Sequence, residues 1–141
     1  MPNPKDPTPP HPSLVSILRQ GPYLIASIHT ALNDSQLVRF QRDLINRIAQ
    51  HRSRGVIIDV AALDVLDSFA SRTLRNTAEM ARLRGAVTTI VGIQPDVAFA
   101  MVELGLDIGP VPTALDLEEA LEYLTRTDQT NPNTHHHPPQ P

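Results

Sequence analysis

The chain has 141 residues, the length of one ordinary domain, and a formal net charge of −3 at pH 7. It has no cysteine, which excludes a disulfide and a zinc–thiolate site, and its arginines form no cluster that would favour nucleic acid or an anionic membrane surface. No apolar run approaches the roughly 18 residues of a membrane-spanning helix, and the proline-rich start has no apolar signal-peptide region. We therefore expect a cytoplasmic protein that binds neither nucleic acid nor membrane.

The prolines divide the chain into a domain and two tails. Of the 14 prolines, six lie in the first 12 residues and four in the last 10. We expect residues 1–13 to form a disordered proline-rich tail, residues 14–127 one folded domain, and residues 128–141 a second disordered tail. The three adjacent histidines at residues 135–137 can hold a transition metal weakly, but a solvated tail explains them more simply, and no metal site is expected.

The first part of the domain predicts a hairpin followed by a helix. Two short apolar runs, residues 14–20 and 23–29, surround a Gly-Pro turn and predict a β-hairpin. Asn33 or Asp34 can cap the amphipathic helix that follows. This helix should run for about 17 residues and end near Gly55.

The rest of the domain alternates between strands and helices. Residues 55–60 are a continuously apolar run, typical of a strand covered on both faces. After a loop, the pattern predicts in turn a helix over residues 68–84, a strand over 87–91, a helix over 96–104, an extended piece over 108–111 and a helix over 115–127. This order predicts an α/β fold with a mixed, mostly parallel sheet of about five strands and about four helices.

The sequence carries no common catalytic signature. Its six glycines are isolated, so no phosphate-binding loop can be drawn, and neither a G-x-S-x-G nor an H-E-x-x-H motif is present. Within residues 14–127 only His29 and His51 could act as an imidazole base, and each is explained more simply as a structural residue. We therefore expect no enzyme, no catalytic residue and no cofactor.

The most informative segment is residues 59–72, where a buried strand ends, a short loop follows and Ser68 opens a helix. In open α/β sheets, functional groups gather beyond the carboxyl ends of the strands. Ser68 has two interpretations. It can be a plain N-cap whose hydroxyl accepts the N–H of Ser71. It can also be a phosphorylation site, where a phosphate would add about −1.5 to −2 charges at the positive end of the helix, beside Asp67 and Asp64.

The same segment also allows a phospho-acceptor aspartate. Asp59 ends the strand, and Asp64 and Asp67 follow closely enough to help bind Mg²⁺. Receiver domains place an aspartate comparably, but they also need an acidic pair near the first strand and a lysine late in the chain. The only lysine here is Lys5, in the expected tail, which counts against this interpretation. Asp59 is explained more simply as a residue that opens the loop by accepting hydrogen bonds from nearby amides.

Five segments in order carry a resemblance to a known family: GVIIDV at residues 55–60, LDVLDSF at 63–69, GIQP at 92–95, ELGL at 103–106 and TALDLE at 113–118. They resemble the STAS domain family, and within it the single-domain antagonists of stressosomes, over about residues 14–125. STAS domains are not enzymes. The resemblance implies helices packed mainly on one face of the sheet and phosphorylation of Ser68. It also implies that Asp64, Asp67 and Phe69 form a loop recognised by the kinase.

The resemblance further implies a regulatory scaffold. Such proteins co-assemble with paralogous STAS proteins that carry sensory domains, hold a serine/threonine switch kinase and release it when phosphorylated. A serine phosphatase then resets the phosphorylated serine. We therefore expect homo- and hetero-oligomers. The alternative is a simpler anti-sigma factor antagonist, which binds an anti-sigma kinase one-to-one and is controlled by the same phosphorylation of Ser68.

Overall fold

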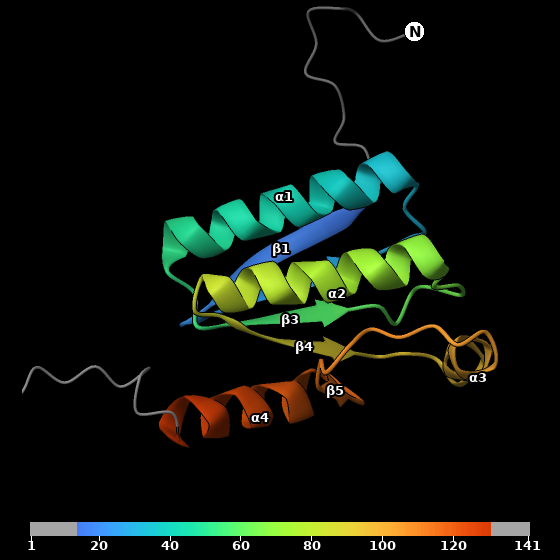
Figure 1. Ribbon diagram of the computed structural model, residues 1–141. Coiled ribbons are helices and arrows are strands. Elements are labelled where there is room, and N and C mark those ends of the chain that lie inside the picture. Colours follow the sequence, from blue (N-terminus) through green and yellow to red (C-terminus); the bar gives the residue numbers. More distant parts are fainter. Residues whose placement is uncertain (1–13, 131–141) are drawn as a thin grey trace, which may run out of the picture.

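The computed structural model describes residues 14–130, which form one five-stranded sheet and four helices (Figure 1). The elements are β1 (Val15–Gln20), β2 (Tyr23–Ile28), α1 (Asp34–His51), β3 (Gly55–Asp59), α2 (Ser68–Leu83), β4 (Val87–Val91), α3 (Pro95–Glu103), β5 (Thr113–Ala114) and α4 (Leu117–Thr130). The strands follow the order β1-β2-β3-β4-β5, with β1 and β2 antiparallel and every later pair parallel. The predicted fold class is therefore confirmed. Residues 1–13 and 131–141, which include the histidines at 135–137, lie outside the described residues.

Two helices, α1 and α4, differ from the sequence prediction by more than one residue, for local reasons. α1 ends at His51, earlier than predicted, because Arg52 adopts a left-handed conformation (φ 50°) and its N–H closes the last turn on the carbonyl of Ile48. α4 is shifted toward the C-terminus from its predicted span. It starts only after Asp116, whose carboxylate accepts the N–H of Glu119 at 2.9 Å.

The fifth strand also lies further along the chain than predicted. β5 does not form at residues 108–111, because Pro110 and Pro112 have no N–H to donate to a ladder. Pairing with β4 starts instead where the Pro112 carbonyl accepts the N–H of Ile90 at 3.0 Å. The prediction of an extended strand at residues 108–111 is therefore wrong.

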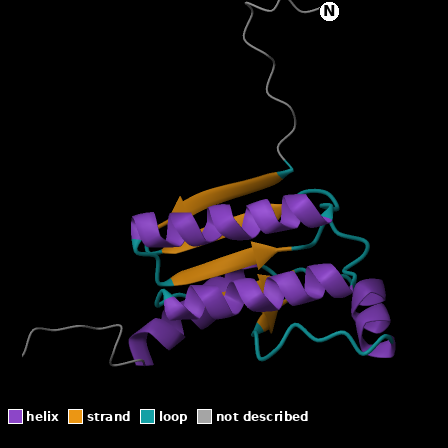
Figure 2. Ribbon diagram, turned by 45° about the horizontal axis from the view of Figure 1, so that its top comes forward, coloured by secondary structure: helices purple, strands orange, loops and turns teal. Residues whose placement is uncertain are grey.

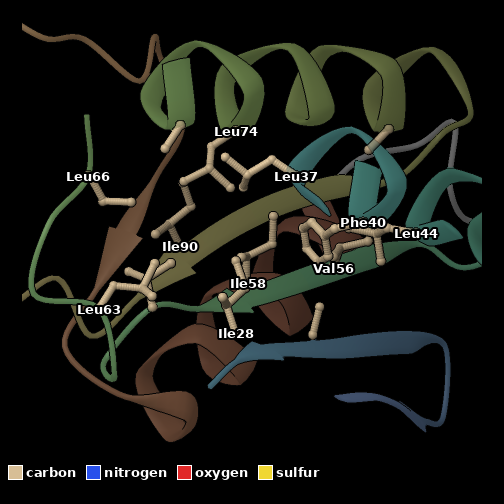
Figure 3. Close-up of a cluster of buried hydrophobic side chains, with 14 of the residues drawn as sticks. Ile28, Leu37, Phe40, Leu44, Val56, Ile58, Leu63, Leu66, Leu74 and Ile90 are labelled. Carbon is tan, nitrogen blue, oxygen red and sulfur yellow. The ribbon is translucent and has the colours of Figure 1, made fainter. Parts of the chain in front are cut away.

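One face of the sheet is covered by α1 and α2. Alternate residues of the central strands point toward these helices and join their apolar stripes in one buried cluster (Figure 3). The cluster includes Leu24, Ile28, Leu37, Phe40, Leu44, Ile48, Val56, Ile58, Leu74 and Ile90. The amphipathic pattern predicted for the first helix is confirmed by this packing.

The opposite face of the sheet is covered by α4. Tyr23, Ile57 and Val91 point away from α1 and α2 and pack with Ala120 and Leu124 of α4. This refines the expected arrangement of helices mainly on one face. α3 lies at the end of the sheet toward which the parallel strands point, in both ribbon views (Figures 1 and 2). Among the helices of the described part, none is both long enough and apolar enough to span a membrane.

Candidate functional site

The segment around Ser68 lies at the carboxyl edge of the sheet, the edge at which the parallel strands β2, β3 and β4 end. β3 ends at Asp59, whose carboxylate accepts the N–H of Ala61 at 2.9 Å and turns the chain into the loop that precedes α2. Leu63 and Leu66 are buried in the core and anchor this loop (Figure 3). The loop is therefore held in a defined position ahead of α2.

The N-cap of α2 is Asp67. Its carboxylate accepts the N–H of Ala70 at 2.8 Å, and its carbonyl accepts the N–H of Ser71 at 2.9 Å. The interpretation of Ser68 as a plain N-cap is therefore wrong. Both residues are good caps, so sequence alone does not separate two candidates one position apart. The aspartate is favoured because its negative charge also interacts with the positive end of the helix.

Ser68 is the first residue of α2, and its side chain is exposed. Its hydroxyl makes no hydrogen bond to any residue between 14 and 130. The other hydroxyls of the first two turns are not available in this way. Ser71 is buried, and Thr73 is buried with its hydroxyl donating to the Phe69 carbonyl at 2.8 Å. Of the hydroxyls in these two turns, Ser68 is the one that a partner can reach.

The exposed charges nearest to Ser68 along the chain are those of Asp64, Asp67 and Arg72. Phe69 is partly buried and packs against the core cluster, so its ring holds the start of α2 in place. The positive end of α2 and the amides of its first turn favour a phosphate at this position. The two carboxylates oppose it.

The other sequence candidates do not form a second site. Asp59 is partly buried and engaged with the amide of the loop, which agrees with its simpler interpretation. His29 has its Nε2 3.0 Å from the hydroxyl of Ser16 on β1, and His51 ends α1 at the opposite edge of the sheet. Within residues 14–130, no group of three or more His, Asp or Glu side chains is placed to hold a metal ion.

Sequence reasoning missed two contacts that support the loop before α2. The side-chain amide of Gln94 donates to the Ala61 carbonyl at 2.7 Å, which joins the loop after β4 to the loop before α2. Gly92, with φ of +82°, lies so close that an added Cβ would come within 2.8 Å of the Ala61 Cβ. In the sequence, these two contacts are indicated only by the match of the Gly-Ile-Gln-Pro segment to the family pattern.

A five-stranded mixed sheet with an exposed serine opening the second helix is the arrangement expected of a STAS domain. The sequence model of the STAS domain family matches residues 15–120, and the chain therefore belongs to that family. RsbS of Moorella thermoacetica, solved as a serine-to-glutamate variant, is 33% identical. This match covers 84% of the present chain and 100% of the other, with a TM-score of 0.72. A chain in the structure of the stressosome, described as a signal integration and transduction hub, is 29% identical over 82% of this chain and 100% of its own, with a TM-score of 0.65.

Relatives found by sequence agree with these structural matches. The RsbT co-antagonist protein RsbRA of Bacillus subtilis is 33% identical over 92 residues, which are 64% of this chain and 34% of RsbRA. The present chain thus spans about a third of the length of that relative. The anti-sigma factor antagonist SpoIIAA, at 12% identity and a TM-score of 0.60, shares the fold alone. The chain is an RsbS-like STAS-domain protein.

Proposed function

We propose that this chain is a non-enzymatic regulatory scaffold of a stressosome, which binds an RsbT-type serine/threonine switch kinase and releases it when Ser68 is phosphorylated. The observation that carries the proposal is the exposed Ser68 hydroxyl, which takes no part in the cap that Asp67 provides. The relatives RsbRA and RsbRB are both named as RsbT co-antagonists, which supports an RsbT-type protein as the target.

The switch follows from local charge. Phosphorylation adds about −1.5 to −2 charges to an edge that already carries Asp64 and Asp67. A kinase that binds the unmodified edge balances those two carboxylates, but it has no group set aside for a phosphate in the centre of the contact. Burying the added charge without a partner weakens binding. A coupling of about 1–3 kcal/mol, or 5–150-fold in affinity, is ordinary for such an effect.

The proposal includes three further partners or contacts. A paralogous STAS protein with a sensory domain shares the scaffold, and a serine phosphatase removes the phosphate from Ser68. Asp64, Asp67 and Phe69 contribute to recognition by the kinase. RsbRA extends well beyond the part that matches this chain, which covers 34% of it, and this supports a larger paralogue with an additional domain. We place the assembly in the cytoplasm as homo- and hetero-oligomers.

A one-to-one anti-sigma factor antagonist is the second candidate. It is supported by the fold shared with SpoIIAA, and it uses the same serine. Identity of 33% to RsbS, against 12% to SpoIIAA, favours the stressosome. Sedimentation of the chain with its kinase and an RsbR-type paralogue separates the two candidates. The proposed scaffold gives a large assembly, and the second candidate gives a complex of two chains.

The direct test uses the full chain, MgATP and the RsbT homologue of the organism that encodes it. Mass mapping should find phosphate on Ser68 and none on Ser71 or Thr73. Kinase affinity should be equal for the unmodified protein and Ser68→Ala, and lower for the phosphorylated protein. Phosphate that persists in Ser68→Ala would overturn the site. Tighter binding after phosphorylation would overturn the direction of the switch.

A further inference from the structure

Thr88, in the first half of β4, has a backbone N–H and carbonyl that no other strand pairs. In the parallel ladder between β3 and β4, the N–H of Val87 donates to the Arg54 carbonyl at 3.0 Å. Neighbouring residues of a strand direct their backbone groups to opposite sides, so those of Thr88 point away from β3, toward the side on which β5 lies. Among residues 14–130, none forms a hydrogen bond with them.

A proline explains why β5 does not cover this part of β4. β5 has only two residues, and its first, Thr113, lies opposite Ile90. If this register continued toward the start of β4, residue 112 would donate its N–H to the Thr88 carbonyl, but Pro112 has no N–H. The segment that joins α3 to β5 therefore runs back to the sheet without pairing there (Figure 1).

A hollow of about 510 Å³ lies between α2, the first half of β4 and the segment before β5. Much of its lining is apolar and comes from Ala78, Ala86, Val87, Pro110 and Val111. Thr88 also lines the hollow. It is only 5% exposed, and its hydroxyl has no hydrogen-bond partner within the described part of the chain. Sites for small molecules have volumes of about 300–1,000 Å³ and combine an apolar lining with a few polar groups, as this hollow does.

Arg75 is the charged residue of the hollow that has no partner of its own. Arg82 forms an ion pair with Glu79 at 2.6 Å, and the Asp107 carboxylate accepts the N–H of Gly109 at 2.7 Å. Arg75 is exposed and forms no hydrogen bond or ion pair with any residue from 14 to 130. Its side-chain carbons lie so close to Gly109 that an added Cβ would come within 2.9 Å of them. This contact holds the Arg75 side chain beside the hollow.

We propose that this hollow binds a small organic anion, an inference that does not depend on the function proposed above. The Arg75 guanidinium binds the carboxylate or phosphate group of the ligand, because it offers several N–H donors in one plane. The apolar body of the ligand packs against Ala78 and Val111, and a polar atom of the ligand bonds to Thr88. An extended peptide fits less well, because it needs several open positions along a strand, and this edge has one.

The test follows the backbone amide signals of the full chain by NMR during titration with 2-naphthoate, an apolar carboxylate, and with 2-naphthamide, its neutral counterpart. We expect 2-naphthoate to shift the amide signals of Asn76, Thr88 and Val111, which line the hollow, and to reach saturation. Half-saturation should lie at about 1 mM or below, the affinity expected of a ligand with roughly 13 non-hydrogen atoms. 2-Naphthamide should bind about 5-fold more weakly or less tightly still, because it carries no charge for Arg75.

Three variants test the role of each part of the hollow. Arg75→Gln keeps most of the side-chain stem and removes the charge, so it should weaken 2-naphthoate binding by about 5-fold or more and leave 2-naphthamide binding unchanged. Arg72→Gln is the matched control, because Arg72 is exposed on the same helix but does not line the hollow, and it should change binding by less than about two-fold. Ala78→Phe fills the hollow and should abolish binding of both compounds. Thermal melting checks that each variant is folded.

Saturable shifts around the hollow that Arg75→Gln weakens and Arg72→Gln leaves in place would support the inference. Equal binding of 2-naphthoate to these two variants, or equal binding of 2-naphthoate and 2-naphthamide to the wild type, would show that Arg75 selects no anion, and the inference would be wrong. It would also be wrong if no saturable shift appeared around the hollow up to about 10 mM, ten times the expected half-saturation. The titration contains no kinase, so these results leave the function proposed above untouched.

Discussion

Replacement of Asp67 by alanine removes two interactions that one side chain makes. The Asp67 carboxylate caps α2 by accepting the N–H of Ala70 at 2.8 Å, and its charge interacts with the positive end of the helix. Loss of an N-cap costs about 1 kcal/mol, and loss of the charge costs about 0.3–1 kcal/mol more. We therefore expect Asp67→Ala to lower the free energy of unfolding by about 1–2 kcal/mol. For a domain of this size, that lowers Tm by roughly 4–10 °C.

Two companion variants show which interaction is lost. Asp67→Asn keeps a capping oxygen and removes the charge, so it should recover most of the stability. Ser68→Ala should change the free energy of unfolding by less than about 0.5 kcal/mol, because the Ser68 hydroxyl makes no hydrogen bond within the described residues.

The measurement is urea unfolding of the full chain at pH 7, followed by circular dichroism, for the wild type and the three variants. The expected order of stability is wild type and Ser68→Ala together, then Asp67→Asn, then Asp67→Ala. A larger loss in Ser68→Ala than in Asp67→Ala would place the cap on the serine. That result would refute the assignment of Asp67 as the cap and the argument that the Ser68 hydroxyl is unengaged.

Two further predictions concern the core and the ends of the chain. A Cβ added at Gly55 would lie 2.9 Å from the Tyr23 ring and 3.0 Å from the Leu124 side chain. Gly55→Ala should therefore lower the free energy of unfolding by about 1–3 kcal/mol. An unchanged Tm would show that α4 can move away from β3. Shortening the chain to residues 14–130 should shift Tm by only about a few degrees, because the segments removed are mainly proline and polar residues. A large drop in Tm would show that one of these segments packs on the domain.

The parts of the fold that follow from the sequence are those with long, unambiguous patterns. The apolar run of β3 is buried on both faces, as a continuous run predicts. The spacing of Leu37, Leu44 and Ile48 predicts the buried stripe of α1, and Asn33 caps that helix as one of the two predicted caps. In the strand and in the helix stripe many residues carry the same signal, so local exceptions do not change the result.

The parts that sequence reasoning missed depend on single residues or on tertiary contacts. β5 has only 2 residues and no pattern of its own, so its position is set by where β4 offers a partner. The sequence does not show which of the adjacent residues Asp67 and Ser68 caps α2, because both are good capping residues. α3 has apolar residues around most of its circumference, and its sequence does not reveal that Met101 faces the core while Phe99 faces solvent.

The contacts around Ser68 also bear on how a phosphate there can act. The loop before α2 is held by buried Leu63 and Leu66 and by the hydrogen bond from Gln94, and the cap belongs to Asp67. A phosphate on Ser68 therefore replaces no existing hydrogen bond, and the helix end offsets part of its charge. A modification shifts a conformational equilibrium only when it interacts differently with two states, and this edge offers the phosphate no contact to break. Under the function proposed above, the effect on a partner then arises inside the contact itself, from charge brought to its centre. In that proposal, a kinase that covers Ser68 directly therefore fits this edge better than one that senses the phosphate from elsewhere on the domain.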